Sequence, residues 1–218
     1  MFADIAPSYD LVNSLMSFRL HHRWRNQAVQ KLALSPGDSA LDVCCGTGDF
    51  LVPLREKVSA TGKVHGVDFC APMLEVAKKK LGDAAQVALG DACNLPIASQ
   101  SYDAVSVGWG LRNVPDVPAA LREMARVLKP GGRFVSLDMA RPRGRVFGAV
   151  SEWVMHRVVP TIGRVFGKSV AYTYLPKSTL KFMSREELVS AMQSAGFENV
   201  AYKDMFFGNI CMHWGMKR

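Results

Sequence analysis

Short apolar runs that alternate with helix-like segments constrain the fold of this chain more than any other feature of its sequence. The runs end near Val43, Val67, Leu89, Val107 and Leu137, and most are followed by apolar residues at helical spacing. Strands that alternate with helices form parallel sheets with right-handed crossovers. The sequence therefore predicts an α/β fold built on a doubly wound, mostly parallel sheet.

The same pattern sets the expected elements. Strands are predicted at Ala40–Val43, Gly62–Val67, Gln86–Leu89, Ala104–Val107 and Arg133–Leu137, and helices at 8–33, 49–58, Ala71–Leu81, Ala119–Leu128 and Arg185–Ala195. A closing β-hairpin over Val200–Lys203 and Met205–Met212 would bring the sheet to seven strands. The run Lys78-Lys79-Lys80 is most simply interpreted as a solvated helix face.

Length and composition exclude several classes of protein. The 218 residues suit one domain, and 49% hydrophobic with 21% charged residues argues against disorder. No apolar stretch reaches the roughly 18 residues of a membrane-spanning helix, and the first ten residues lack the basic-then-apolar order expected of a signal peptide. Five cysteines, an odd number, suit reduced thiols in a cytosol, and no metal-site spacing occurs. Within the domain we expect a helical N-terminal cover (1–35), a ligand-binding core (36–140), a basic helical insertion (141–183) and a closing helix with hairpin (184–218).

A glycine-rich turn follows the first predicted strand and precedes a helix. It reads Asp42-Val-Cys-Cys-Gly46-Thr47-Gly48-Asp49, and such glycines let a ligand approach backbone amides at a helix N-terminus. The turn is not a dinucleotide fingerprint, because Leu51 occupies the place of the third glycine. A purely structural turn is the alternative interpretation.

Two further acids favour a ligand over a structural turn. Asp68 ends the second strand, where a carboxylate can accept both hydroxyls of a ribose, and Asp91 ends the third strand, where it could hold an adenine edge. Ligands of open α/β sheets bind outside the carboxyl ends of the strands, where these acids are expected. Over residues 39–138 this set resembles the class I S-adenosylmethionine-dependent methyltransferases, with their Rossmann-like seven-stranded fold.

Motifs along the whole chain are more specific. The start Met1-Phe-Ala-Asp-Ile-Ala-Pro-Ser-Tyr9-Asp10-x-x-Asn13, the turn Gly110-Leu-Arg112-Asn113-Val114, the segment Ala171-Tyr-Thr-Tyr174-Leu-Pro176-x-Ser178 and the closing His213-Trp-Gly are similar to menaquinone/ubiquinone biosynthesis C-methyltransferases of the UbiE/MenG type. Arg19 and Gly108 depart from that family, which usually has a small residue and a serine there. Relatives also carry a segment before the first motif, so either the start is trimmed or this version lacks that cover.

The resemblance implies a cofactor, S-adenosylmethionine, with S-adenosylhomocysteine as product, and a polyprenyl quinol as substrate. A demethylmenaquinol is the expected acceptor, and a benzoquinol precursor of ubiquinol or another small molecule is the alternative. The implied cofactor-binding residues are Asp42, Gly46, Thr47, Gly48, Asp68, Phe69, Asp91 and Ala92. The implied substrate contacts are Tyr9, Asn13, Arg112 and Tyr172.

Methylation at carbon requires the quinol to lose a phenolic proton. A phenol with a pKa near 10 is ionised to about one part in a thousand at pH 7. We expect Arg112 to stabilise the phenolate, with Asn113 as a neutral donor beside it and Tyr9 closing over the substrate. Asp49 is the expected base, directly or through water. Each of these roles has a plainer alternative. Arg112 could lie in a solvated loop, and Asp49 could cap a helix. Tyr9 and Asn13 could belong to an ordinary helix. No role is expected for His21 and His22.

Positive charge is concentrated near the C-terminus. The net charge is +8, and residues 141–218 hold twelve Lys and Arg against five Asp and Glu. Within 141–168, apolar residues including Trp153 repeat at helical spacing, which is typical of a membrane-surface helix. We therefore expect a cytoplasmic protein bound peripherally to the inner face of the membrane. A helix that covers the sheet edge or forms a homodimer is the alternative.

Two other functional classes agree less well with the residues of this sequence. An RNA methyltransferase should show stacking aromatics on a basic face or an Asn-Pro-Pro-Tyr-like motif after the fourth strand. That position reads Gly108-Trp-Gly-Leu-Arg, so no nucleic-acid partner is expected. A non-catalytic cofactor-binding protein is disfavoured because the acids at all three strand ends are present.

Overall fold

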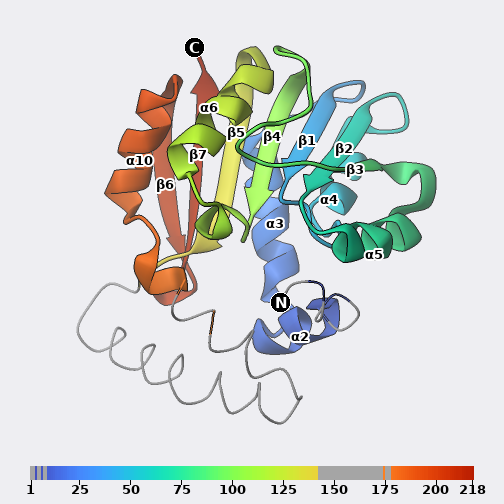
Figure 1. Cartoon of the computed structure of the whole chain (residues 1–218), viewed down its shortest axis with the longest axis horizontal. Helices are drawn as coiled ribbons and strands as arrows, with labels where there is room; N and C mark the ends of the chain where they lie inside the picture. The colour runs from blue at the N-terminus through green and yellow to red at the C-terminus, as the bar shows by residue number, and fades with distance from the viewer. Residues whose placement is uncertain (1–2, 4–5, 7–8, 142–173, 175–177) are drawn as a thin grey trace.

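A computed structural model describes residues 3, 6, 9–141, 174 and 178–218 of the chain. Seven strands form one sheet in the order β3-β2-β1-β4-β5-β7-β6 (Figure 1). They are β1 (Ser39–Val43), β2 (Lys63–Asp68), β3 (Gln86–Leu89), β4 (Tyr102–Gly108), β5 (Leu128–Met139), β6 (Phe197–Met205) and β7 (Ile210–Lys217). Strands β1 to β5 are parallel, whereas β7 runs antiparallel to both β5 and β6. The predicted fold class is confirmed.

Helices flank both faces of the sheet (Figure 1). The described α-helices are α2 (Tyr9–Met16), α3 (Leu20–Lys31), α4 (Leu51–Val58), α5 (Ala71–Leu81), α6 (Val117–Val127) and α10 (Arg185–Ser194). The predicted helical stretch 8–33 is thus two helices, broken where Phe18 and Arg19 adopt positive φ angles of 49° and 61°. Among the described residues, no helix has the length and hydropathy to cross a bilayer.

Alternating side chains divide the core into two layers. Along β1, Leu41 and Val43 pack into the layer that contains α6 and α10, whereas Ala40 packs into the layer that contains α3 and α4. Successive residues of a strand point to opposite faces, so a run of consecutive apolar residues is required when both faces are covered. This explains why the central strands read as short continuous apolar runs.

The closing hairpin lies later in the sequence than predicted. Its second strand was expected at Met205–Met212 but is β7, and Met205 instead ends β6. The connection is a short 3₁₀ turn at Phe206–Gly208, in which Phe206, Phe207 and Gly208 all have positive φ. Phenylalanines are unusual in such a turn, so the sequence offers no turn signal there.

The carboxyl ends of the parallel strands meet at one edge of the sheet, and α2 lies beside that edge (Figure 1). Helix α3 begins there and runs back along the sheet towards the start of β1 (Figure 1). Most of the predicted basic insertion, including Trp153 and the substrate contact Tyr172, falls outside the described residues.

Candidate active site

A pocket of about 430 Å³ lies at this edge, between the ends of β1, β2, β3 and β4. Seven of the predicted site residues line it: Tyr9, Gly46, Asp68, Phe69, Asp91, Ala92 and Asn113. Its described lining does not include Asn13, Asp42, Thr47, Gly48, Asp49 or Arg112. The additional lining residues are mainly apolar or small, and sequence reasoning did not assign them to a ligand: Cys44, Val67, Cys70, Met73, Gly90, Gly108, Trp109, Gly110, Val114 and Pro115.

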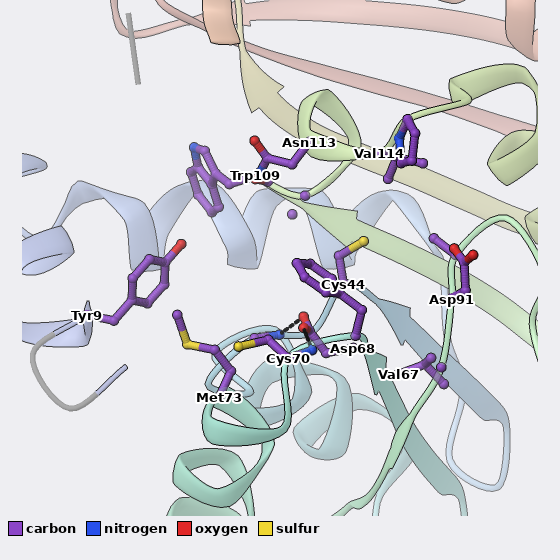
Figure 2. Close-up of a pocket in the computed structure, with 17 residues that line it drawn as sticks. Tyr9, Cys44, Val67, Asp68, Cys70, Met73, Asp91, Trp109, Asn113 and Val114 are labelled. Carbon is purple, nitrogen blue, oxygen red and sulfur yellow. Dashed lines mark hydrogen bonds between the residues drawn. The ribbon is translucent and has the colours of Figure 1, made fainter. Parts of the chain in front are cut away.

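Asp68 holds the glycine turn against the end of β2. One carboxylate oxygen accepts the backbone N–H of Gly46 at 2.8 Å, and the other accepts that of Cys70 at 2.9 Å (Figure 2). Burial raises the pKa of Asp68, while these backbone hydrogen bonds act to lower it. The side chain is buried yet lines the pocket, so its remaining lone pairs can accept hydroxyl groups of a ligand.

Asp91 lies across the pocket from Tyr9 (Figure 2). Its carboxylate accepts the backbone N–H of Cys93 at 2.9 Å and remains exposed to the pocket. Val67 and Val114 lie near it and provide apolar wall (Figure 2). An acidic acceptor beside apolar walls can take a flat heterocycle with an exocyclic amino group.

The glycine turn has two constrained positions. Gly46 and Gly48 have φ angles of +54° and +83°. A Cβ at Gly48 would also lie 2.7 Å from the Leu81 side chain, so this glycine is required for packing against α5. Asp42 lies beneath the turn, fully buried, and accepts a 2.5 Å hydrogen bond from the Ser106 hydroxyl. Burial raises the pKa of Asp42 to about 8.

Asp49 belongs to an ion-pair cluster rather than to the pocket. Its carboxylate lies 2.9 Å from Nη2 of Arg25 and 2.7 Å from Nζ of Lys80. Burial alone would raise the pKa of Asp49, but these two cations outweigh it and lower that pKa. A carboxylate with a lowered pKa is a weak base, so the arrangement argues against the expected role. The cap alternative is not seen either, because Phe50 is the N-cap residue of α4 and no side chain caps it.

The side chain of Arg112 is only 7% exposed, which rules out the solvated-loop alternative. Its Nη1 lies 2.6 Å from Oδ1 of Asp138 and donates to the Trp109 carbonyl at 2.5 Å. Its Nε is buried without a hydrogen-bond partner among the described residues. The predicted phenolate stabiliser therefore lies just behind the pocket wall, with its charge already paired.

Asn113 lines the pocket and is oriented by the same carbonyl. Its Nδ2 donates to the Trp109 carbonyl at 3.1 Å, while Oδ1 is buried with no hydrogen-bond partner in the described structure. A carbonyl oxygen can only accept, so the atom facing Trp109 must be the amide nitrogen. Asn113 therefore presents an acceptor, where the sequence had predicted a donor.

Trp109 and Gly108 form the part of the pocket wall next to Asn113. Trp109 has a φ of 54°, and the Arg25 guanidinium lies 4.7 Å from its ring centroid. A Cβ at Gly108 would lie 2.3 Å from the Phe50 ring, so the serine usual in the resembling family has no room here. Trp109 lines the pocket and packs against the core layer that contains α3 and α4.

Helix α2 supplies Tyr9, whose ring lies near Met73 and Trp109 (Figure 2). Asn13, one turn later, is half-buried but does not line the pocket. His21 is buried on α3 beside Arg25, and burial lowers its pKa to about 4. His21 and His22 do not line this pocket, which agrees with assigning them no role.

Comparisons with known proteins agree with this geometry. Residues 1–217 match the ubiE/COQ5 methyltransferase family. The chain is 42% identical over 222 residues to a demethylmenaquinone methyltransferase of Alkalihalophilus pseudofirmus, covering all of this chain and 94% of that protein. It is 39% identical to the demethylmenaquinone methyltransferase of Lactiplantibacillus plantarum, with the same coverage. A solved SAM-dependent methyltransferase from Thermotoga maritima superimposes with a TM-score of 0.71 at 26% identity, over all of this chain and 98% of that one.

Proposed function

This chain belongs to the ubiE/COQ5 methyltransferase family, and on that premise we propose that it methylates a ring carbon of demethylmenaquinol, using S-adenosylmethionine as the methyl donor. The observation that carries the proposal is full-length similarity to relatives named demethylmenaquinone methyltransferase. Methylation of a benzoquinol is the competing possibility, and the names of these relatives favour the naphthoquinol.

The pocket residues fit this cofactor. Asp68 would accept the ribose hydroxyls, and Asp91 would accept the adenine amino group between apolar walls such as Val67 and Val114. Gly46 lines the pocket with no Cβ, so its backbone allows close approach of the methionine part. When bound, S-adenosylmethionine supplies an electrophilic methyl group, and S-adenosylhomocysteine is the product.

Asn113 and Tyr9 would position the quinol. The free Oδ1 of Asn113 can accept the hydrogen bond of a quinol hydroxyl, which raises electron density on the oxygen and on the adjacent ring carbon. Tyr9 lines the same pocket, on the cover formed by α2. Alignment of the reacting carbon supplies much of the rate in such a transfer.

Arg112 would support Asn113 without itself lining the pocket. Its guanidinium and the Asn113 amide both donate to the Trp109 carbonyl, so Arg112 fixes the loop that presents the acceptor. Its positive charge would also favour a phenolate, although Asp138 at 2.6 Å neutralises part of that effect.

We further propose that the protein works at the inner face of the membrane, because a polyprenyl quinol does not leave the bilayer. The basic composition of residues 141–168 supports this, as does the exposed Phe18 beside Arg19 in the turn after α2. Phe18 is 80% exposed. An apolar tip beside basic residues is typical of peripheral membrane proteins.

Mass spectrometry of the cellular quinone pool tests the proposal. A strain that lacks the protein should accumulate demethylmenaquinone and lose menaquinone, and a copy of the wild-type gene should restore menaquinone. An unchanged pool would contradict the proposed substrate. Accumulation of a demethylated benzoquinone instead would show that the alternative acceptor is correct.

A further inference from the structure

Lys80 joins two elements that are far apart in the sequence. Its Nζ lies 2.5 Å from Oδ2 of Asp10, in the first turn of α2, and 2.7 Å from Oδ1 of Asp49, just before α4. Lys80 itself lies in the last turn of α5. The lysine run lies on an exposed helix face as predicted, but the ammonium group of Lys80 is in addition paired with two carboxylates.

The second oxygen of Asp10 is also bound. The Thr47 hydroxyl, in the glycine turn, donates to Oδ1 of Asp10 at 2.6 Å. One carboxylate on α2 is thus attached both to the turn beside the pocket and to α5. Tyr9, the adjacent residue of α2, lines the pocket.

The charges around Lys80 leave no other cation in position to neutralise Asp10 among the described residues. Asp10 and Asp49 both point at its ammonium group, and without it two carboxylates would face each other. Arg25 contacts Asp49 at 2.9 Å, and His21 lies 3.9 Å from the same carboxylate, but neither is paired with Asp10. The side chain of Lys80 is 27% exposed and that of Asp49 is 14% exposed, so solvent screens these ion pairs only in part.

We propose that Lys80 is a positioning residue that fastens α2, and with it Tyr9, over the pocket. The inference rests on the proposed function, because it assigns α2 the task of covering the quinol. Since Thr47 holds the same carboxylate, closure of α2 is coupled to the conformation of the glycine turn. By reciprocity, whatever stabilises that turn also favours the closed cover.

The lysine run itself supplies a matched control. Lys79→Met removes the same charge from the same helix, and among the described ion pairs none involves Lys79. Steady-state kinetics on a water-soluble, short-tailed quinol would compare Lys80→Met, Lys80→Arg and Lys79→Met. We expect Lys80→Met to raise KM for the quinol about fivefold, the scale of losing two partly exposed ion pairs, with a smaller change in kcat. Lys80→Arg should restore most of the affinity, and Lys79→Met should match wild type.

Amide hydrogen exchange separates this inference from the proposed function, because it needs no turnover. Residues 9–16 should exchange faster in Lys80→Met than in Lys79→Met, while β1 and β4 remain equally protected in a folded variant. Equal exchange in the two variants would overturn the role of Lys80, whatever the substrate. Faster exchange without any quinol methylation by wild type would instead contradict the proposed function and leave the fastening role of Lys80 supported.

Discussion

Nη1 of Arg112 lies 2.6 Å from Oδ1 of Asp138, and both side chains are less than a tenth exposed. The backbone N–H of Arg112 also donates to Oδ2 of Asp138 at 3.1 Å. The cation that was predicted to stabilise a phenolate therefore has its own buried counter-ion. Removing one partner of a buried pair costs about 3–5 kcal/mol, so Arg112→Ala would mix folding and catalytic effects.

Arg112→Lys is the more informative change. Lysine keeps a positive charge near Asp138, but its side chain is shorter and lacks the planar guanidinium whose Nη1 donates to both Asp138 and the Trp109 carbonyl. We expect kcat to fall about 100-fold, the scale of a 1 Å misplacement of a group that positions the substrate, while calorimetry shows nearly unchanged affinity for S-adenosylmethionine. Normal turnover would exclude Arg112 from the chemistry.

Asp138→Asn tests the counter-ion separately. The amide can still accept from the Arg112 backbone but no longer neutralises the guanidinium. If Arg112 acts on a phenolate, the freed charge should move the acidic limb of the pH–rate profile to lower pH, even if folding stability falls. A profile that keeps its shape would show that the pair is only structural.

Asp68→Ala should weaken cofactor binding. The variant loses a charged acceptor for ligand hydroxyls and also two backbone hydrogen bonds of the turn, to Gly46 and Cys70. A charge-assisted hydrogen bond contributes about 1.5–3 kcal/mol, so affinity should fall at least tenfold by isothermal titration. A folded variant with wild-type affinity would remove Asp68 from the site.

His213 should make the protein sensitive to acid. Burial lowers its pKa to about 4, against about 6.5 when exposed, so protonation favours the unfolded state. The loss of unfolding free energy due to His213 is absent well above pH 6.5. It grows as the pH falls towards 4 and reaches about 2 kcal/mol at pH 5. Urea unfolding at pH 7.5 and pH 5 should show a smaller loss of stability in His213→Gln than in wild type. An equal loss would assign the acid sensitivity elsewhere, with buried His21 the next candidate.

Membrane attachment predicts a salt effect on vesicle binding. Each basic residue near an anionic surface contributes about 1 kcal/mol, and salt screens that attraction. Reversing Arg141, Arg143 and Arg145 to Glu should reduce sedimentation with anionic vesicles and activity on a long-tailed quinol. Activity on a short-tailed analogue should survive. Equal loss on both substrates would show that these residues shape the fold or the site, and a change in oligomeric state would favour the dimer alternative.

The fold was largely predictable because local signals agreed with one another. The helix Ala71–Leu81 and the strand Gln86–Leu89 have the predicted bounds, since glycines and loops delimit them clearly. The hairpin was misplaced because Phe206 and Phe207 occupy a turn that usually takes glycine or asparagine. Packing of the surrounding strands overrode the local preference of those residues.

The site was predictable where it depends on position along a strand, and not where it depends on long-range pairing. Asp68 and Asp91 line the pocket because acids at strand ends must meet at one edge of the sheet. The carboxylate partner of Arg112 lies 26 residues away in the sequence, and those of Lys80 lie 31 or more residues away. No local pattern reveals such a pairing.

Transfer of a labelled methyl group tests the central claim most directly. The purified protein would be incubated with S-adenosylmethionine labelled in its methyl group and with a reduced, short-tailed demethylnaphthoquinol. Mass spectrometry and NMR should place the label on the ring carbon, and Asp68→Ala should slow the transfer when S-adenosylmethionine is subsaturating. Label on a quinol oxygen, or no label on the quinol from a protein that still binds S-adenosylmethionine, would contradict the assignment of this chain as a quinol C-methyltransferase.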